Sequence, residues 1–285
     1  MTTKTTTRAT TRATTKGGGN MTENRRSLDD RTKTARPTVK ATVKQDGFAS
    51  LLGSSHKIEL SNGYGVAWFS QAMYLAPASS IIDGVSREVC AFRSPECSEL
   101  CLSTSGRGGM STVQTIRLAR TKLFWRDRPR FLELLRRDIR SLIRRAHRQG
   151  KQAACRLNAT SDIPWELIGG ILEEFPQVTL YDYTKSYKRM IKFLEGRMPS
   201  NYHLTFSRSE VNDDQVADVL ARGGNVAAVF STKMGDALPE SYRGRRVIDG
   251  RAHDMRFLDP QGGNWVGLSP IGKAKKGSWG FILEV

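Results

Sequence analysis

The stretch VTLYDYTKSYKRMIKFLEGRMPSNYHLTFSRSE (178–210) decides the fold class of this protein. Its pattern predicts a strand over residues 178–186, a helix over 187–196 and a second strand over 202–210. A strand, a helix and a strand in this order form a βαβ unit, in which the two strands lie parallel. The stretch therefore predicts an α/β fold.

The same alternation continues on both sides of this stretch. Before it, we expect a strand over residues 153–162 and a helix over 165–176. After it, we expect a helix over 212–224, capped by Asn212, and a strand over 225–233. Repeated βα units build a parallel sheet covered by helices, so we expect a partial or complete (βα) barrel-like sheet.

The flanking regions complete the expected fold. The aromatic, β-prone residues 63–77 predict a hairpin or a pair of strands. A helical region follows and breaks at Pro129, after which residues 131–149 place Leu and Ile at spacings of three and four. This spacing predicts an amphipathic helix. From residue 245 the chain returns to β-rich sequence with Gly turns.

The chain divides into an arm and a domain. Residues 1–46 begin with Thr-, Lys- and Arg-rich low-complexity sequence and offer few apolar residues for a core, so we expect a disordered basic arm. Met21 follows a GGGN sequence and is an alternative start. We expect residues 47–285 to form a single α/β, catalytic-like domain.

Polar residues follow the predicted strands at the point where each strand ends. In parallel α/β folds the ligand site lies at the carboxyl ends of the strands. Helix capping explains some of these residues, but Lys and Arg side chains cannot accept a bond from a helix N–H. We therefore expect a shared site with catalytic residues Asp162, Asp182, Lys185 and Arg208, and with cofactor-binding residues Arg107, Asn158, Ser161 and Ser207.

Cys90, Cys97 and Cys101 fall within twelve residues, in a loop expected after an N-terminal strand or hairpin. No apolar run is long enough to span a membrane and the N-terminus lacks an apolar signal segment, so we expect a reducing, cytoplasmic location without disulfides. Clustered cysteines in such a chain indicate a metal site or catalysis. The fourth cysteine, Cys155, shares a strand face with Leu157 and is expected to be a core thiol.

Two metals suit the three clustered cysteines. A closed structural zinc site normally has four ligands, so zinc would need a further Cys or His. A [4Fe–4S] cluster held by three cysteines leaves one iron open, and S-adenosylmethionine bound there starts radical chemistry. The order of hairpin, three-Cys loop and βα repeats is similar to radical-SAM enzymes, although their usual spacing, C-x3-C-x2-C, differs from C-x6-C-x3-C here.

The chain also resembles a family of phage and plasmid proteins called gene product 88. The resemblance covers about residues 58–285 and rests on SPECSELCLSTSGRG, RLNATSDIPWE, YDYTK, NYHLTFSRSE, GGNVAAVF, VIDG, RFLDP and WVGL. It implies an origin in a phage, plasmid or integrated element, and hence the cytoplasm of a bacterial host cell. It implies no particular activity.

The basic charge of the chain points to nucleic acid as a partner. The net charge is +17, and residues 117–148 hold twelve Lys and Arg against three acidic residues. Arginines opposite the apolar stripe of the helix 131–149 can contact phosphates of DNA or RNA, although a solvated outer helix has the same pattern. The expected contact residues are Arg137, Arg140 and Arg144.

Three functional hypotheses follow from these features. The first is an iron–sulfur protein, in particular a radical-SAM-like enzyme that acts on or near nucleic acid. The second is a non-enzymatic nucleic-acid-binding accessory protein with a structural zinc site. The third is a metal-dependent nuclease that uses His253 with the carboxylates of Asp249, Asp254 and Asp259.

Overall fold

A computed structural model describes residues 46–276 and 279–285 of the chain. These residues all belong to one compact unit, which comprises residues 37–285. The predicted arm, residues 1–46, lies outside the described residues except for Asp46.

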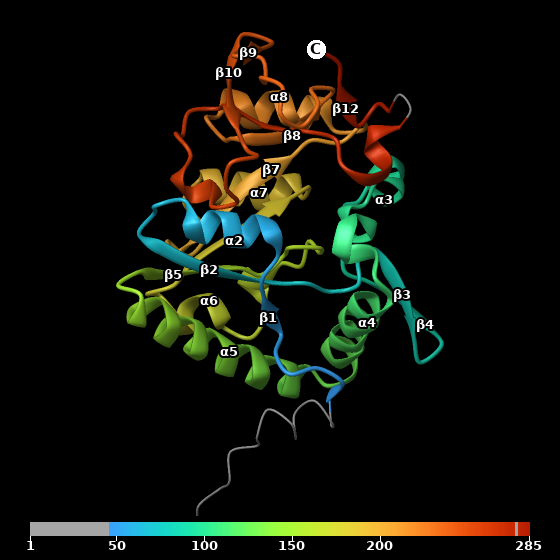
Figure 1. The fold of residues 1–285 in the computed structure, drawn as a ribbon, viewed down its shortest axis with the longest axis vertical. Coiled ribbons are helices and arrows are strands. Elements are labelled where there is room, and N and C mark those ends of the chain that lie inside the picture. Colours follow the sequence, from blue (N-terminus) through green and yellow to red (C-terminus); the bar gives the residue numbers. More distant parts are fainter. Residues whose placement is uncertain (1–45, 277–278) are drawn as a thin grey trace, which may run out of the picture. The chain divides into compact units, whose positions relative to one another are not determined.

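A mostly parallel sheet forms the framework of this unit (Figure 1). Its parallel strands run in the order β2-β5-β6-β7-β8-β11-β10, with β1 and β9 antiparallel at the two edges and β12 parallel beside β8. The strands are β1 (Leu52–Gly53), β2 (Trp68–Met73), β5 (Gln152–Arg156), β6 (Thr179–Thr184), β7 (Tyr202–Ser207), β8 (Val226–Phe230), β9 (Ser241–Tyr242), β10 (Arg245–Asp249), β11 (Trp265–Leu268) and β12 (Ile282–Leu283).

The α/β class with a parallel sheet is thus confirmed. The complete barrel is wrong, because the sheet begins at β1 and ends at β9 and these two edge strands do not pair with each other. A barrel requires both edges of a sheet to be joined by hydrogen bonds.

The helices are α2 (His56–Gly63), α3 (Pro95–Glu99), α4 (Ser111–Arg126), α5 (Arg128–Arg148), α6 (Ile171–Glu174), α7 (Tyr187–Leu194) and α8 (Asp213–Ala221). In Figure 1, β2 and β5 lie between α2 and α5. The amphipathic helix predicted over 131–149 is confirmed as α5, which begins one turn earlier because Asp127 caps it and Pro129 fits its first turn.

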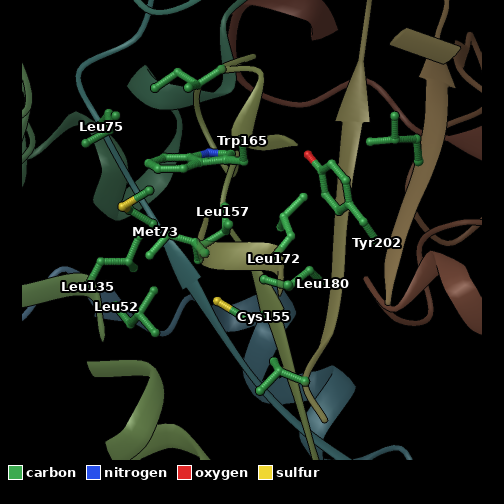
Figure 2. Close-up of a cluster of buried hydrophobic side chains, with 14 of the residues drawn as sticks. Leu52, Met73, Leu75, Leu135, Cys155, Leu157, Trp165, Leu172, Leu180 and Tyr202 are labelled. Atoms are coloured by element: carbon green, nitrogen blue, oxygen red, sulfur yellow. The ribbon is translucent and has the colours of Figure 1, made fainter. Parts of the chain in front are cut away.

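The main core lies between the sheet and the helices of the crossover connections. Leu135, Ile139 and Leu142 of α5 are fully buried against it. Figure 2 shows Cys155 and Leu180 in this cluster. The prediction that Cys155 is a core thiol is confirmed, since its side chain is 0% exposed.

The opposite face of the sheet is covered by α2 and by the short 310 helix η4 (Arg256–Leu258). The Phe257 ring lies 5.4 Å from that of Trp68 and 5.3 Å from that of Tyr181, both in edge-to-face contact. Edge-to-face contacts of this kind suit the aromatic quadrupole. This face therefore has its own, smaller apolar cluster.

Two local predictions are wrong. The helix expected over 165–176 is reduced to a 310 turn, η3 (Trp165–Leu167), and the short α6, because Gly169 and Gly170 adopt left-handed φ values of 67° and 62° between them. Residues 63–77 form only one strand, β2, whereas the hairpin lies just after it, as β3 (Ser79–Ile82) and β4 (Val85–Glu88).

Within residues 46–276 and 279–285, no helix has the length and apolarity that a membrane crossing requires.

Candidate functional site

A cavity of about 270 Å³ opens at the carboxyl ends of β5, β6, β7 and β8. Parallel strands bring their carboxyl ends to one edge of a sheet, which is where such folds bind ligands. The cavity brings together residues that lie more than a hundred positions apart in the chain. Those that the sequence singled out are Cys90, Cys97, Cys101, Asn158, Ser161, Asp162, Lys185, Ser207 and Arg208.

The three clustered cysteines form one wall of this cavity. Cys90 follows the β3–β4 hairpin, Cys97 lies in α3, and Cys101 follows the end of that helix. The predicted cysteine loop is therefore largely helical, since α3 is followed by the 310 helices η1 (Leu102–Thr104) and η2 (Gly106–Gly109).

Cys90 is partly buried at this wall. Its sulfur lies 3.6 Å from the carbonyl oxygen of Thr160, in the loop that follows β5. Burial, with a smaller contribution from the nearby Cys101, raises the pKa of Cys90 to about 12. The Cys90 thiol is therefore protonated at neutral pH, and a metal ion would have to displace its proton.

Glu210, which lies just after β7, fixes α3 to the sheet. Its carboxylate accepts hydrogen bonds from Ser94 Oγ at 2.7 Å and from the Glu96 backbone N–H at 2.9 Å. Ser94 is also the N-cap of α3, because its hydroxyl accepts from the Cys97 N–H at 3.2 Å. A chain of three contacts thus places Cys97 relative to the strand ends.

The donor set of this wall suits a thiolate-ligated metal, because three cysteine side chains border one space and Cys90 and Cys101 are close enough to interact electrostatically. In the described part of the chain, however, no group of three or more His, Cys, Asp or Glu side chains is arranged to hold a metal ion. Loading would therefore require the thiol side chains to turn towards a common centre.

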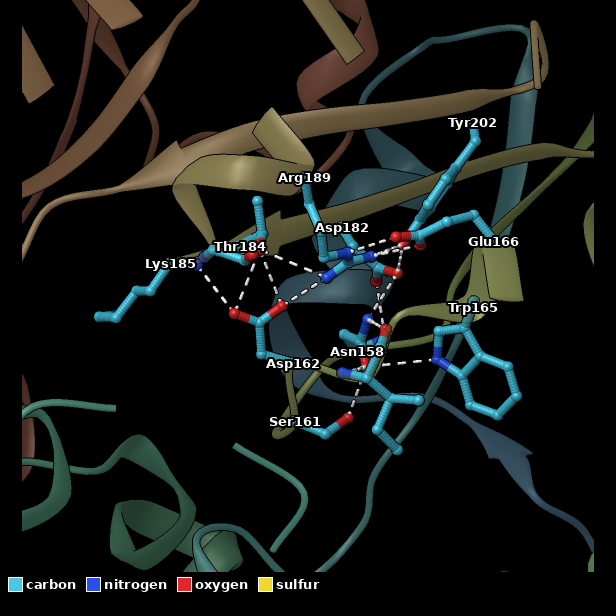
Figure 3. A network of polar contacts seen from close by, with 12 residues as sticks. Asn158, Ser161, Asp162, Trp165, Glu166, Asp182, Thr184, Lys185, Arg189 and Tyr202 are labelled. Carbon is cyan, nitrogen blue, oxygen red and sulfur yellow. Dashed lines mark hydrogen bonds and ion pairs between the residues drawn. The ribbon is translucent and has the colours of Figure 1, made fainter. Parts of the chain in front are cut away.

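Asn158 is the centre of a buried polar network at the end of β5 (Figure 3). Its Nδ2 donates to Ile163 O at 2.9 Å and to Asp182 Oδ2 at 3.0 Å. Its Oδ1 accepts from the Ile163 N–H, the Ser161 hydroxyl and the indole N–H of Trp165. All hydrogen-bonding positions of this amide are thereby occupied, so its side chain shapes the cavity wall.

Asp182 lies behind this wall and does not border the cavity. Its carboxylate accepts from the Asn158 backbone N–H at 2.6 Å and from the Tyr202 hydroxyl at 2.8 Å. Burial raises the pKa of Asp182 to about 7, although these hydrogen bonds oppose the shift. The predicted catalytic residue Asp182 is thus placed where it supports Asn158.

Asp162 borders the cavity but is engaged with its own chain. It accepts from the Thr184 hydroxyl at 2.9 Å, from the Lys185 N–H at 2.8 Å and from the buried Arg189 guanidinium at 2.6 Å. Figure 3 shows Arg189 between Asp162 and Glu166. The arginine neutralises the Asp162 charge and ties the ends of β5 and β6 together.

Lys185 and Arg208 differ in how far their hydrogen-bond donors are already used within the chain. Lys185 Nζ donates to Ser207 Oγ at 2.9 Å and forms no ion pair with any residue that the structure describes. Arg208 is bound to Asp213 at 2.9 Å and also donates to Gly280 O. Since an ammonium has three donors, Lys185 retains two for a ligand in the cavity.

Arg107 is the one proposed cofactor-binding residue placed away from this site. It is exposed in η2 and does not border the cavity.

Lys57, Arg156 and Tyr183 also border the cavity, and no pattern in the sequence singles them out. Asp254, which the sequence predicted to belong to a nuclease site, borders it as well. Arg156 and Tyr183 lie inside predicted strands, where alternation alone makes them ordinary inward-facing residues. Lys57 and Asp254 come from segments 197 positions apart, α2 and the loop after β10, which meet only in the fold.

The predicted nucleic-acid contacts on α5 are partly occupied within the chain. Arg140 pairs with Glu174 at 2.7 Å, and Arg137 donates to the Ala49 carbonyl and pairs with Asp138. Arg144 is exposed. The basic face of α5 therefore presents less free charge than the sequence suggests.

The C-terminal Asp and His residues do not converge as a nuclease site requires. Asp249 pairs with Arg251, Asp254 with Arg156 and Asp259 with Arg256, at 2.9, 2.8 and 3.2 Å. His253 Nε2 lies 3.9 Å from Asp259 Oδ1, and burial lowers the pKa of His253 to about 4. An arginine thus already compensates each of these carboxylates.

Comparison with known proteins yields one match. The model of a family described as gene product 88 matches residues 29–283. No curated protein and no solved structure matches the chain.

Proposed function

The chain belongs to the gene product 88 family, and we propose that it is an iron–sulfur enzyme whose reaction takes place in the strand-end cavity. Cys90, Cys97 and Cys101 would hold a [4Fe–4S] cluster at the cavity wall. The observation that carries this proposal is that three thiols and the polar strand ends border one cavity.

The cluster would supply reactivity that the side chains of the cavity lack. Held by three cysteines it keeps one iron open to a small molecule, and with S-adenosylmethionine it supplies radical chemistry. A recessed cavity suits such chemistry because its walls limit the access of water and other quenching groups to the reacting atoms.

The side chains of the strand ends would bind and orient the small molecule. Lys185 has two N–H donors to offer a carboxylate, and it lies 5.5 Å from the Phe281 ring, which closes that side of the cavity. The Ser161 hydroxyl donates to Asn158 and can accept a further bond, whereas the Ser207 hydroxyl accepts from Lys185 and can still donate one. Asp162, bound to Arg189, would hold the Lys185 backbone in place.

Replacement of the cysteines one at a time tests the location of the cluster. Cys97→Ser should abolish visible charge-transfer absorption of anaerobically purified protein, and Cys90→Ser and Cys101→Ser should do the same. Cys155→Ala is the matched control, because Cys155 lies in the core and not at the cavity. Equal absorption in the Cys97→Ser protein and the native protein would disprove the assignment.

A second function, nucleic-acid binding, is favoured by the exposed end of α5. Arg144, Arg145 and Arg148 are all exposed there. Clustered arginines attract phosphates and release counterions. This activity is compatible with either an iron–sulfur cluster or a structural zinc ion at the cysteines, so we propose it separately from the chemistry of the cavity.

A further inference from the structure

The cavity continues below the cysteine wall to a charged floor. The floor consists of Lys57 from α2, Arg156 from the end of β5, Tyr183 from β6, and Asp254 from the loop after β10. Arg156 and Asn158 are two residues apart on one strand face, which corresponds to a depth of about 7 Å. The floor is therefore one residue layer deeper in the sheet than the network around Asn158.

The floor holds more positive than negative charge. Arg156 donates to both oxygens of Asp254, at 3.0 and 2.8 Å, and Lys57 Nζ lies 3.5 Å from the same carboxylate. The single carboxylate of Asp254 thus interacts with two cations. Burial lowers the pKa of Lys57, and the neighbouring Arg156 contributes to this shift.

Two polar atoms of the floor have no partner among the described residues. They are the Nε of Arg156 and the hydroxyl of Tyr183, and both atoms are buried. The Arg156 guanidinium stacks on the Tyr183 ring at 4.5 Å, which fixes its plane. A buried donor without a partner costs free energy, so this pair is suited to a group that brings acceptor oxygens.

We propose that this floor is a subsite for an oxyanion group, a phosphate or a carboxylate, of the molecule that the protein acts on. Arg156 presents a planar, fixed donor, Lys57 adds the unbalanced positive charge, and the Tyr183 hydroxyl can donate a further bond. Together with Lys185 nearer the opening, the floor would hold an anionic substrate at two levels of the cavity.

The subsite implies that the substrate of the proposed enzyme is an anion. The orientation of that substrate rests on the proposed function, because the iron–sulfur cluster would lie at the cysteine wall. With its anionic group on the floor, the opposite end of the molecule would face the cysteine wall. Anion binding itself depends only on residues of the floor, so it can be measured on metal-free protein.

The test is isothermal titration of metal-free, full-length protein with inorganic phosphate and, separately, with succinate. Low and constant ionic strength is needed, because exposed cations also attract anions. We expect binding of at least one of the two anions, and the stronger of them identifies the group. Lys57→Gln should weaken that binding about 10-fold or more.

Lys188→Gln is the matched control, since Lys188 is exposed on α7 and does not border the cavity. It should bind like the native protein. Arg156→Gln should lose binding as well, but Lys57→Gln decides the matter if loss of Arg156 prevents folding. No binding of either anion, or equal binding by Lys57→Gln and native protein, would overturn the subsite whatever the metal content proves to be.

Discussion

Asn158 and Asp182 show how the site is stabilised at the scale of single residues. The amide of Asn158 is 2% exposed and joins the end of β5 to the loop that carries Ser161 and Ile163. Asp182 holds both the backbone and the side chain of Asn158 from the neighbouring strand. Hydrogen bonds within the chain therefore hold the cavity wall at Asn158 in place.

Replacement of Asn158 should destabilise the whole domain. Asn158→Ala leaves the buried Ile163 N–H and the Trp165 indole N–H without an acceptor and removes one bond from Asp182, so we expect a loss of about 3 kcal/mol in the free energy of unfolding. Urea denaturation followed by tryptophan fluorescence measures it. Thr160→Ala, which removes one bond to Leu75 O, is the control and should cost about 1 kcal/mol.

Asp182 should make stability depend on pH. Its pKa is about 7 in the folded chain against 3.8 for an ordinary aspartate, so the fold favours the protonated carboxyl. This pKa shift contributes up to about 4 kcal/mol to the free energy of unfolding. The contribution is fully present below about pH 4 and is lost as the pH rises through about 7. Native protein should therefore lose more stability over this range than Asp182→Asn does. Parallel pH profiles for the two proteins would contradict this role.

At the residue scale, the sequence predicted those site residues that directly follow a strand. Asn158, Asp162, Lys185, Ser207 and Arg208 reach the cavity because parallel strands end at one edge. Their individual roles were not predictable, because pairs such as Asp162 with Arg189 join residues 27 positions apart. Lys57 was missed, and Asp254 was assigned to a different site, for the same reason, since only the fold brings α2 to the loop after β10.

At the scale of elements, contacts with the sheet determine the position of α3, the helix of the cysteine wall. This helix is only five residues long, so its own hydrogen bonds stabilise it little and its position depends on tertiary contacts. Glu210 provides two of these contacts, and Phe281 N–H donates to Glu96 at 2.6 Å to provide another. The placement of Cys97 thus depends on residues far from the cysteines.

Removal of the Glu210 carboxylate charge should weaken metal binding without unfolding the domain. Glu210→Gln loses one charged acceptor to Ser94 or Glu96, so we expect about 10-fold weaker retention of metal against a chelator. Glu173→Gln is the control, because Glu173 is exposed on α6. Unchanged retention in Glu210→Gln, with native thermal stability in both proteins, would show that α3 is held without Glu210.

Prediction of elements succeeded where the pattern was long and failed where local glycines or side chains intervened. The strands near 153–162, 178–186, 202–210 and 225–233 are β5, β6, β7 and β8. The cap predicted at Asn212 occupies the N-cap position of α8, but its Oδ1 accepts from the Ser209 N–H at 2.7 Å instead of from the helix. Such a competing bond depends on the conformation of the loop, which the hydrophobic pattern of the sequence does not predict.

At the scale of the whole molecule, charge and topology separate the two proposed activities. The cavity lies at the strand ends, whereas α5 packs on a face of the sheet through its apolar stripe and exposes Arg144, Arg145 and Arg148. Since no residue of α5 borders the cavity, nucleic-acid binding and the chemistry of the cavity should be separable by mutation.

Charge reversal on α5 should reduce affinity for nucleic acid and its dependence on salt. We expect Arg144→Glu with Arg148→Glu to lower the slope of log K against log salt by about 2, and to leave the metal content unchanged. Fluorescence anisotropy with a short duplex and a single strand measures both. Lys188→Glu on α7 is a control of equal charge per site. If native protein shows no affinity at low salt, this second function is excluded.

The iron and acid-labile sulfide content of the full-length chain, purified without oxygen, tests the central claim most directly. The arrangement of Cys90, Cys97 and Cys101 around one cavity predicts about four irons and four sulfides per chain. One zinc per chain, with neither iron nor sulfide, would contradict the iron–sulfur assignment and would leave the cysteines with a structural role.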